Sequence, residues 1–490
     1  MNVPVRRTAV ELTPGNLRVL GRPHTPGEVP KALGRPRLER IVGSALKLPA
    51  DRAAAELADV RRRFADRHRD LDLMLWRNAE QADGLLDGCS DDQRRLVGAY
   101  LTQEHAVEAA ALTNPSMVAA PDQTGVAAGA VRFVLSLRSI GEGHLSSIAF
   151  RSGTVAADGE VTVDPVGRLV ETGERHGATH ERRHFAAKLA EMGADPRVTS
   201  PVLESLPEEF SGADLEEAMA VLDDRPRVET HESARLMRWL VLSNYLLEFD
   251  PDHTPLAERL LWPVGPFESR GMEDARFVRF TGDDEAVTYF GTYTAYDGFT
   301  ILPQLIETTD FERFEISTLS GQAALNKGMA LFPRPIDGEY VALSRPDGER
   351  LHVVRTDDVR SWRRPSTPLR GPEQPWENVQ MGNCGSPIET DEGWLVLTHG
   401  VGPMRQYRMG ALLLDLDDPG RIVADLSEPI LEAADDERDG YVPNVVYSCG
   451  ALRHGDHLVV PYGASDQRTR VAVYSVEDLL AALRREPSAR

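Results

Sequence analysis

The spacing of apolar residues changes several times along the chain, and each change predicts a different kind of element. From Asp51 to Arg69, apolar residues recur every three or four positions, which is typical of an amphipathic helix with Asp51 as its N-cap. Residues 37–110 are therefore expected to be mainly helical. The first 36 residues carry six prolines and several glycines, so they are predicted to form an extended arm.

A β-type pattern begins near Val131, where residues 131–138 read Val-Arg-Phe-Val-Leu-Ser-Leu-Arg. Helical spacing then returns over residues 178–249, most clearly between Met237 and Leu247. A sheet that starts, stops and resumes indicates that this helical segment is an insertion in a β region.

Short β-type runs fill residues 262–474, and turn signals separate them. Asp-Gly pairs occupy positions 297–298, 337–338 and 347–348, and Asp-Glu-Gly occupies 391–393. Asp-Gly between apolar alternations is a strong hairpin signal, and many hairpins without helices between them favour a closed or radially repeated all-β fold. Ser475 then begins a capping-box pattern that predicts a terminal helix as far as Arg485.

The fold class that follows is mainly β. The stretches 131–177 and 262–474 provide about five blocks of the 40–50 residues that a four-stranded blade requires, which favours a propeller over a sandwich. We expect a five-bladed β-propeller over residues 111–490 with a helical insertion at about 178–250. Residues 1–110 would form an N-terminal arm and helical region.

The net charge of the chain limits the classes of molecule that it can attract. The chain has 490 residues and a formal net charge of −22, which gives no electrostatic attraction for nucleic acid or an anionic membrane surface. The first 70 residues are basic instead, with 15 Lys and Arg against 8 Asp and Glu. They include three consecutive arginines at 61–63. A solvated helix face is the simple interpretation of that run. A contact with an acidic subunit surface, and hence a homo-oligomer, is the alternative.

The cysteines indicate the compartment. Cys89, Cys384 and Cys449 are few, odd in number and far apart, so the sequence predicts neither a disulfide framework nor a zinc site. No apolar run approaches the 18 residues of a membrane span, and no apolar stretch follows the basic residues near the N-terminus. A cytoplasmic protein without a membrane span or a bound metal is the expectation.

Two adjacent acids are the first candidates for chemistry. Residues 271–276 read Gly-Met-Glu-Asp-Ala-Arg, just ahead of a β-type run. In a regular strand Glu273 and Asp274 would point to opposite faces, so one acid would face a pocket and the other an arginine. An ordinary ion pair with Arg270 or Arg276 is the alternative.

Cations and a histidine follow further along. Lys327 and Arg345 stand at the start and end of a predicted hairpin, which would bring two cations together around an anion, unless each has a surface acid of its own. His399 lies at a predicted strand end with Tyr407 eight residues later; it is either part of a site or a structural histidine. Residues 439–447 and 462–466 add the aromatic and polar groups that bind sugars.

Taken together and in this order, these blocks resemble glycoside hydrolase family 130, the β-mannoside phosphorylases and related hydrolases. The resemblance is carried by residues 114–115, 135–138, 271–276, 292–296, 327–345, 381–387, 399–400, Tyr407 and 439–466. It covers most of the β portion, and the sequential order of the blocks makes accidental agreement improbable.

The resemblance implies a five-bladed propeller with the active site at its central mouth. It implies that Asp274 protonates the glycosidic oxygen while inorganic phosphate, the co-substrate, attacks the anomeric carbon and releases mannose 1-phosphate. No other cofactor is expected. The residues it assigns to phosphate are Lys327, Arg345, His399 and Tyr407, with Arg138 as a weaker candidate. The residues it assigns to the mannoside are Asn114, Glu273, Arg276, Tyr293 and Asp466.

The sequence departs from the family pattern in three places. Ala275 stands where proline usually follows the two acids, Lys327 stands where other members have arginine, and the N-terminal region and the insertion exceed the minimal catalytic unit. The two additions leave the sugar linkage and the acceptor open.

Two other functions remain. An inverting hydrolase would need a carboxylate to activate water, for which Glu273, Glu373 and Glu377 are candidates. A non-catalytic sugar-binding propeller would use the same aromatic and polar residues without turnover.

Overall fold

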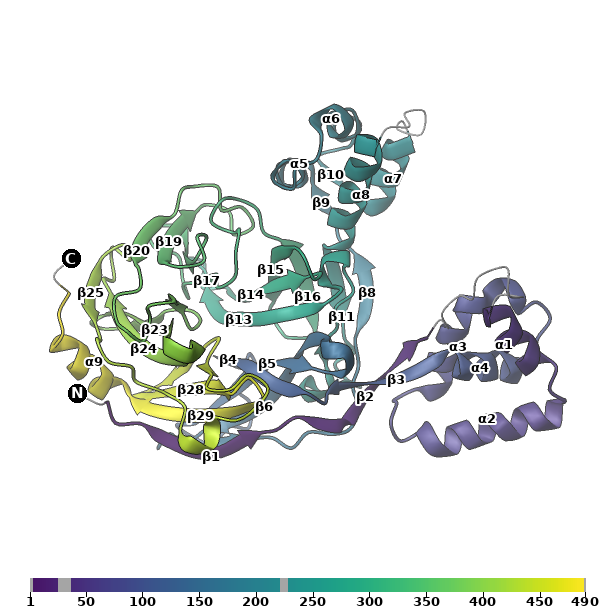
Figure 1. Cartoon of the computed structure of the whole chain (residues 1–490), viewed down its shortest axis with the longest axis horizontal. Helices are drawn as coiled ribbons and strands as arrows, with labels where there is room; N and C mark the ends of the chain where they lie inside the picture. The colour runs from purple at the N-terminus through teal and green to yellow at the C-terminus, as the bar shows by residue number, and fades with distance from the viewer. Residues whose placement is uncertain (1–2, 25–36, 221–227, 489–490) are drawn as a thin grey trace.

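The protein is mainly β, with two groups of α-helices outside the sheets. The computed structural model describes residues 3–24, 37–220 and 228–488. Figure 1 shows the large sheets arranged around a common centre, with α1–α4 and α5–α8 standing away from them in two different directions. Among the described residues, no helix combines the length and the apolar character that crossing a bilayer requires.

The helices fall where the periodicity predicts them. The N-terminal group consists of α1 (Arg37–Leu46), α2 (Ala50–Phe64), α3 (Leu71–Asn78) and α4 (Asp91–Tyr100). The insertion consists of α5 (Arg182–Glu191), α6 (Pro196–Ser205), α7 (Gly212–Met219) and α8 (Val228–Leu242). The terminal helix α9 is Val476–Arg484, and the Ser475 hydroxyl accepts a hydrogen bond from the Asp478 amide at 3.1 Å as predicted. Asp51 is not the cap of α2, because the helix starts one residue earlier and Pro49 is its N-cap.

The early strands form one sheet of eleven strands and two small pairs. The eleven are β4 (Ala111–Ala119), β5 (Val131–Ile140), β6 (Ser146–Val155), β7 (Val161–Val163), β8 (Glu174–Gly177), β11 (Tyr245–Glu248), β12 (Leu260–Leu261), β13 (Gly271–Thr281), β14 (Val287–Tyr296), β15 (Ile301–Thr308) and β16 (Arg313–Thr318). The pairs are β2 (Gly15–Pro23) with β3 (Thr102–Glu108) and β9 (His180–Glu181) with β10 (Glu209–Phe210). The large sheet runs in the order β4-β5-β6-β13-β14-β15-β16-β11-β8.

Three further sheets complete the β region. The first is β17 (Ala330–Leu331), β18 (Tyr340–Ser344), β19 (Leu351–Thr356) and β20 (Thr367–Arg370). The second is β21 (Gln380–Asn383), β22 (Ile388–Thr390), β23 (Gly393–Val401), β24 (Tyr407–Leu414) and β25 (Ile422–Asp425). The third is β26 (Val446–Tyr447), β27 (Leu452–His454), β28 (His457–Ala464), β29 (Arg468–Ser475) and β1 (Arg6–Leu12).

The Asp-Gly turns connect adjacent antiparallel strands, as the sequence predicts. The pairs at 297–298, 337–338 and 347–348 join β14 to β15, β17 to β18 and β18 to β19. Asp337 has a φ of 55° and the glycine after it a φ of 74°, the left-handed conformations that these residue types tolerate.

Five apolar cores connect the strand groups in a cycle. One core packs β4–β6 against β13–β16, and the next packs β13–β15 against β17–β19. The third joins β18–β19 to β21–β25, and the fourth joins β23–β25 to β26–β29. The fifth returns from β28 and β29 to β4–β6. Because each strand group has a core on both faces, the long β runs are apolar almost throughout, as Gly393–Val401 illustrates with every residue buried.

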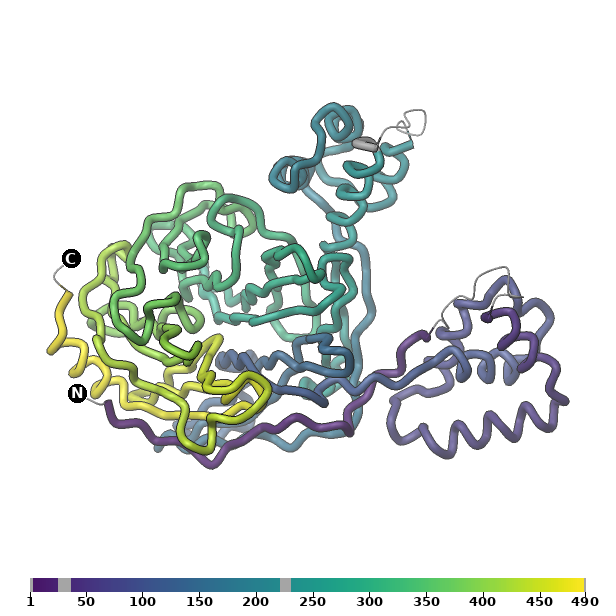
Figure 2. The backbone as a smooth tube through the Cα atoms, in the orientation of Figure 1, coloured from purple at the N-terminus to yellow at the C-terminus, as the bar shows by residue number. Residues whose placement is uncertain are grey.

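The predicted N-terminal arm is extended, but part of it belongs to the sheets. Strand β1 pairs with β29, so the first strand lies beside the last, and Figure 2 shows this segment following the C-terminal strands. Residues 25–36 of the arm lie outside the described residues.

Gly271 at the start of β13 provides a test of how tightly β13 packs against β6. Its φ is 127°, and an added Cβ would lie 2.7 Å from the amide nitrogen and 2.8 Å from the carbonyl oxygen of Ser146. We expect Gly271→Ala to lower the free energy of unfolding by about 2–3 kcal/mol, because both the backbone conformation and the packing oppose it. Urea denaturation measures this. Gly177→Ala is the matched control, since a Cβ there meets nothing within 4 Å; an equal loss in both variants would contradict the prediction.

Candidate active site

A β-bulge in β13 sets the positions of the two adjacent acids. The pairing with β14 shifts register between Glu273 and Arg276, and Asp274 has a φ of 56°. Because an extra residue in one strand disrupts the alternation of side chains, the two carboxylates do not point to opposite faces. Both instead contact Arg138: Glu273 Oε1 at 2.5 Å and Asp274 Oδ1 at 3.5 Å. The expected separation of the two acids was therefore wrong, since it assumed a regular strand.

Both carboxylate oxygens of Glu273 form ion pairs with cations. Its Oε1 accepts from Arg138 and its Oε2 accepts from Lys327 Nζ, each at 2.5 Å. Lys327 reaches it from the segment before β17, and its ammonium also lies 5.9 Å from the centroid of the Tyr296 ring. Because a cation already holds each carboxylate oxygen, Glu273 is poorly placed to bind and activate a water molecule.

Asp274 lies in a concentrated positive field. Burial raises the pKa of its carboxyl, but four nearby cations outweigh burial and hold the pKa below its ordinary value. In decreasing order of effect these cations are Arg138, Lys327, Arg276 and Arg345. The Asp274 side chain keeps 15% of its surface exposed, so a ligand can reach it. A carboxyl in this setting is ionised until an anion offsets the cations.

Arg345 differs from Arg138 and Lys327 in its partners, and from the buried Arg276 in being only half-buried. Among the described residues, no carboxylate lies within ion-pair distance of Arg345, whereas Arg138 and Lys327 both hold Glu273. Its NH1 donates to Nε2 of His399 at 3.2 Å, and its Nε is buried without a hydrogen-bond partner in the described part of the chain. A half-buried guanidinium without a counter-ion is a ready site for an anion.

His399 and Tyr407 continue this side of the site. His399 is in β23 and Tyr407 begins β24, and their rings stack at 6.1 Å between centroids. Burial, with Arg345 and Arg276 adding to it, holds the pKa of His399 well below its ordinary value. His399 is therefore neutral and accepts the hydrogen bond from Arg345 on Nε2.

Asn114 and Asp466 approach from the first and last sheets. Asn114 lies in a bulge of β4 with a φ of 47°, and its buried Oδ1 has no partner among the described residues. Asp466, at φ 48°, accepts from the Thr113 hydroxyl at 3.0 Å. Burial raises the pKa of Asp466, against the opposing charge of Arg138. Several strained conformations in one place are typical of a functional site.

Two of the residues expected to bind substrate lie behind this surface. Arg276 is 3% exposed; its NH1 donates to the Asp274 carbonyl oxygen at 2.8 Å and its NH2 to the Tyr447 hydroxyl at 2.6 Å. Tyr293 is buried in the core and its hydroxyl donates to Glu268. Arg276 thus fixes the bulge that carries Asp274, and Tyr293 supports the strand beside it.

Tyr447 is the neighbour that sequence reasoning did not single out. It lies in β26, holds Arg276, and its ring centre is 4.9 Å from that of His399. Its only signal in the sequence was its place among the aromatic and polar residues at 439–447. It connects the Asp274 side of the site, through Arg276, to the His399 side.

The expected water-activating glutamate at 377 lies elsewhere. Glu377 is 1% exposed, and its Oε1 accepts from Arg370 at 2.8 Å while its Oε2 accepts from the amides of Glu373 and Gln374. These contacts give Glu377 a structural role in the loop before β21.

Comparisons of the sequence with known proteins identify the family. The family described as β-1,4-mannooligosaccharide phosphorylase matches residues 249–485. A 1,2-β-oligomannan phosphorylase of Thermoanaerobacter sp. (strain X514) is 35% identical over 221 residues, which are 43% of this chain and 71% of that protein. The chain belongs to glycoside hydrolase family 130.

Other relatives carry related names. A β-1,2-mannobiose phosphorylase of Listeria innocua is 34% identical over 243 residues, 48% of this chain and 66% of that protein. A solved structure of a β-1,2-mannobiose phosphorylase from the same organism in complex with β-1,2-mannobiose matches with a TM-score of 0.46 at 24% identity, covering 78% of this chain and 94% of that one. As a family 130 member, the protein is a glycoside phosphorylase or a glycosidase.

The family match begins only after the helical insertion of this family 130 protein. Asn114 and Arg138 precede residue 249, yet β4 and β5 join the same sheet as β13 and bring both residues to Asp274 or its neighbours. The insertion that made Arg138 a weaker candidate in the sequence leaves the sheet as a separate helical group, so it does not separate β6 from β13 in space.

The cysteines are unpaired, and two of them, Cys384 and Cys449, are buried near Arg276 behind the site. Cys89, Cys384 and Cys449 are free thiols, and burial raises the pKa of Cys384 to about 12. In the part of the chain that the structure describes, no three histidine, cysteine or acidic side chains are grouped as metal ligands would be.

Proposed function

We propose that this family 130 protein is an inverting β-mannoside phosphorylase, with Asp274 as the general acid and inorganic phosphate as the nucleophile. The observation that carries the proposal is Arg345, a half-buried cation without a carboxylate partner among the described residues, close enough to Asp274 to lower its pKa. Phosphate would supply the missing counter-ion. The names of the relatives, which are mannoside phosphorylases, support the same reaction.

In the proposed mechanism, phosphate lies against Arg345, Lys327 and Arg138, with His399 and Tyr407 beside it. One phosphate oxygen attacks the anomeric carbon of the mannosyl unit as the glycosidic bond breaks. Asp274 gives its proton to the departing oxygen, directly or through a sugar hydroxyl, and mannose 1-phosphate and the shortened sugar result. Asn114 and Asp466 are positioned to contact the mannosyl unit, and Arg276 holds the Asp274 backbone.

The low pKa of Asp274 without phosphate is part of this mechanism. Two negative charges on phosphate would offset the cations that depress the pKa, so the carboxyl would take up a proton when phosphate binds. Phosphate binding would thereby bring Asp274 into the protonated form that a general acid requires.

We also propose that the five cores define five blades, so that the β region over residues 111–490, with the insertion at about 178–250, is a five-bladed propeller. Residues from all five strand groups converge near Asp274, as expected at the central mouth of a propeller. Residues 1–110 would be a separate helical region, apart from β1 and the pair formed by β2 and β3. A cytoplasmic location and a neutral oligosaccharide partner are in keeping with the three free thiols and the net charge of −22.

Product analysis tests the reaction. Purified protein is incubated with β-1,2- and β-1,4-mannobiose, with and without phosphate, and products are followed by phosphorus and proton NMR. We expect mannose 1-phosphate, with the anomeric configuration inverted, only when phosphate is present. Mannose release at the same rate without phosphate would identify a hydrolase, and absence of turnover with every mannoside would favour a sugar-binding protein.

The coupling between the anion and Asp274 gives a prediction with sulfate, which stays fully ionised over the range studied. An anion that raises the pKa of Asp274 binds more tightly when the carboxyl is protonated, so the dissociation constant for sulfate should fall as pH is lowered from 7 to 4. Asp274→Asn removes one negative charge and should bind sulfate about tenfold more tightly at pH 7, with a weaker pH dependence.

Isothermal titration calorimetry measures both quantities. Asp337→Asn is the matched control, because Asp337 has nearly the same φ (55° against 56°) but lies in an exposed turn. Equal sulfate affinity in wild type and Asp274→Asn at every pH would refute the coupling.

A further inference from the structure

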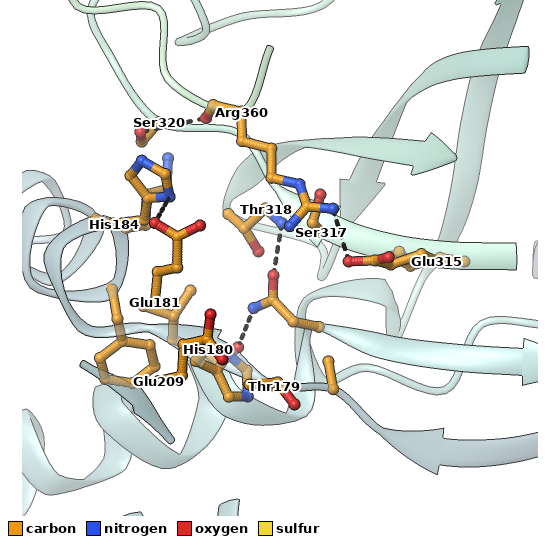
Figure 3. A pocket seen from close by; sticks show the side chains of 16 residues that line it. Thr179, His180, Glu181, His184, Glu209, Glu315, Ser317, Thr318, Ser320 and Arg360 are labelled. Carbon is orange, nitrogen blue, oxygen red and sulfur yellow. Dashed lines mark hydrogen bonds and ion pairs between the residues drawn. The ribbon is translucent and has the colours of Figure 1, made fainter. Parts of the chain in front are cut away.

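A cavity outside the candidate active site lies between the helical insertion and the edge of the large sheet. Its volume is about 360 Å³, within the range of small-molecule pockets. One wall comes from β9, α5 and β10 of the insertion, and the other comes from β16 and the segment around Arg360 (Figure 3). No step of the proposed mechanism uses any of these residues.

The two walls are joined by specific contacts. Asn244 Oδ1 accepts from the Thr318 amide at 2.7 Å, and Glu191 Oε1 accepts from the Gly321 amide at 2.7 Å. His184 of α5 pairs with Asp358 at 2.6 Å. Contacts from three places in the insertion keep the cavity open at a fixed width, so a ligand would meet a preformed site.

Polar groups of the lining have unused hydrogen-bonding capacity. His180 Nε2, Ser317 Oγ and Thr318 Oγ1 are buried and have no partner among the described residues. His180 and Ser317 are 6% and 8% exposed. Burial lowers the pKa of His180 to about 4, so its ring is neutral and offers one donor and one acceptor. Buried polar atoms without a partner destabilise the protein, and a ligand with hydroxyl groups would supply the missing hydrogen bonds.

The lysine and the arginine that line the cavity already have carboxylate partners. Lys188 lies 3.3 Å from Glu191, and Arg360 pairs with both Glu307 and Glu315. These cations therefore do not need an anionic ligand as a counter-ion. Apolar surface from Phe185, Leu240 and Ile316 lies beside the polar groups.

A neutral ligand with many hydroxyl groups and an apolar face fits this lining. We propose that the cavity is a second carbohydrate-binding site, which takes a neutral saccharide of one or two sugar units. The hydroxyl groups would pair with His180, Ser317 and Thr318, and the carbon–hydrogen face of the ring would rest on the apolar residues.

The sheet separates this site from Asp274. Thr318 of β16 pairs with Gln304 of β15, Gln304 pairs with Tyr293 of β14, and the bulge of β13 lies next to that strand. Three strand spacings amount to about 14 Å. A saccharide in the cavity would therefore be bound apart from the reacting bond, and the site would add a place to hold carbohydrate rather than a second catalytic centre.

Calorimetry on the full chain tests the proposal. The Asp274→Asn variant in phosphate-free buffer prevents turnover, and β-1,2-mannobiose and mannose are the probes. We expect two equivalents of saccharide to bind. Adding His180→Phe with Ser317→Ala should weaken the second equivalent at least tenfold, which the loss of about 1.4 kcal/mol would produce. Phenylalanine keeps the ring contacts of His180 with Phe185 and Phe210.

Two further variants make the outcome decisive. Thr179→Trp would fill the cavity from an exposed position without altering the core and should also abolish the second equivalent. Ser386→Ala, which removes an unpartnered hydroxyl from a different cavity, should leave both equivalents. If only the proposed catalytic function fails, one equivalent binds and the cavity variants abolish it. One equivalent that survives the cavity variants, or no binding at all, overturns the second site.

Discussion

Replacing Asp274 by asparagine should lower kcat for phosphorolysis of a mannobiose by about 10²–10⁴-fold, the usual contribution of a general acid. Asparagine has nearly the same size, and it tolerates the left-handed backbone that Asp274 adopts at φ 56°, so the bulge should persist. Only the transferable proton is lost. Initial rates of mannose 1-phosphate formation measure the effect.

The leaving group distinguishes a proton donor from a residue that merely shapes the site. An aryl mannoside whose phenol is strongly acidic leaves without protonation, so Asp274→Asn should slow that substrate far less than it slows mannobiose. Asp337→Asn should leave both rates unchanged, because this aspartate belongs to an exposed turn. Equal loss with both substrates would contradict the role of general acid.

The second large effect is expected at Arg345. Arg345→Ala should raise the KM for phosphate about 10–100-fold, because a charge-assisted hydrogen bond contributes about 1.5–3 kcal/mol. The KM for the mannoside should change little, since the proposed contact is with phosphate alone. Steady-state kinetics with each substrate varied in turn separates the two constants.

Arg334→Ala is the matched control for Arg345. Arg334 is an arginine of the same sheet region with 40% of its side chain exposed, and it pairs with Glu389 at 2.7 Å. Its removal should leave both KM values unaltered, as surface ion pairs contribute little. A parallel rise in the KM values for phosphate and mannoside in Arg345→Ala would mean that the arginine supports the site as a whole, and the phosphate assignment would fail.

Much of the fold could be predicted from local patterns. The Asp-Gly turns, the helical spacing in residues 37–110 and 178–249, and the cap at Ser475 all depend on neighbours in sequence, and the structure has elements at each. The N-cap of α2 was misplaced by two residues, because Asp51 lies in the first turn of the helix and Pro49 precedes it. The pairing of β1 with β29 was not predictable, since it joins residues more than 450 positions apart.

In the candidate site, too, local features could be predicted from the sequence and contacts between distant segments could not. The motif with Glu273 and Asp274 was visible in the sequence, but the bulge that turns both acids toward Arg138 was not, because a register shift is defined only against a partner strand. Glu273 was a candidate base until two cations were found on its oxygens. Arg276 was expected to meet substrate and instead holds the Asp274 carbonyl oxygen.

The sequence by itself determined the family, the mainly β class and the candidates for a proton donor and an anion site, because these depend on the order and identity of residues. Only the tertiary structure decided which cations surround Asp274, that Arg345 lacks a carboxylate partner among the described residues, and that the insertion encloses a cavity beside β16. The physical reason is that charge, burial and unpaired hydrogen-bonding groups arise from atoms that meet across distant segments.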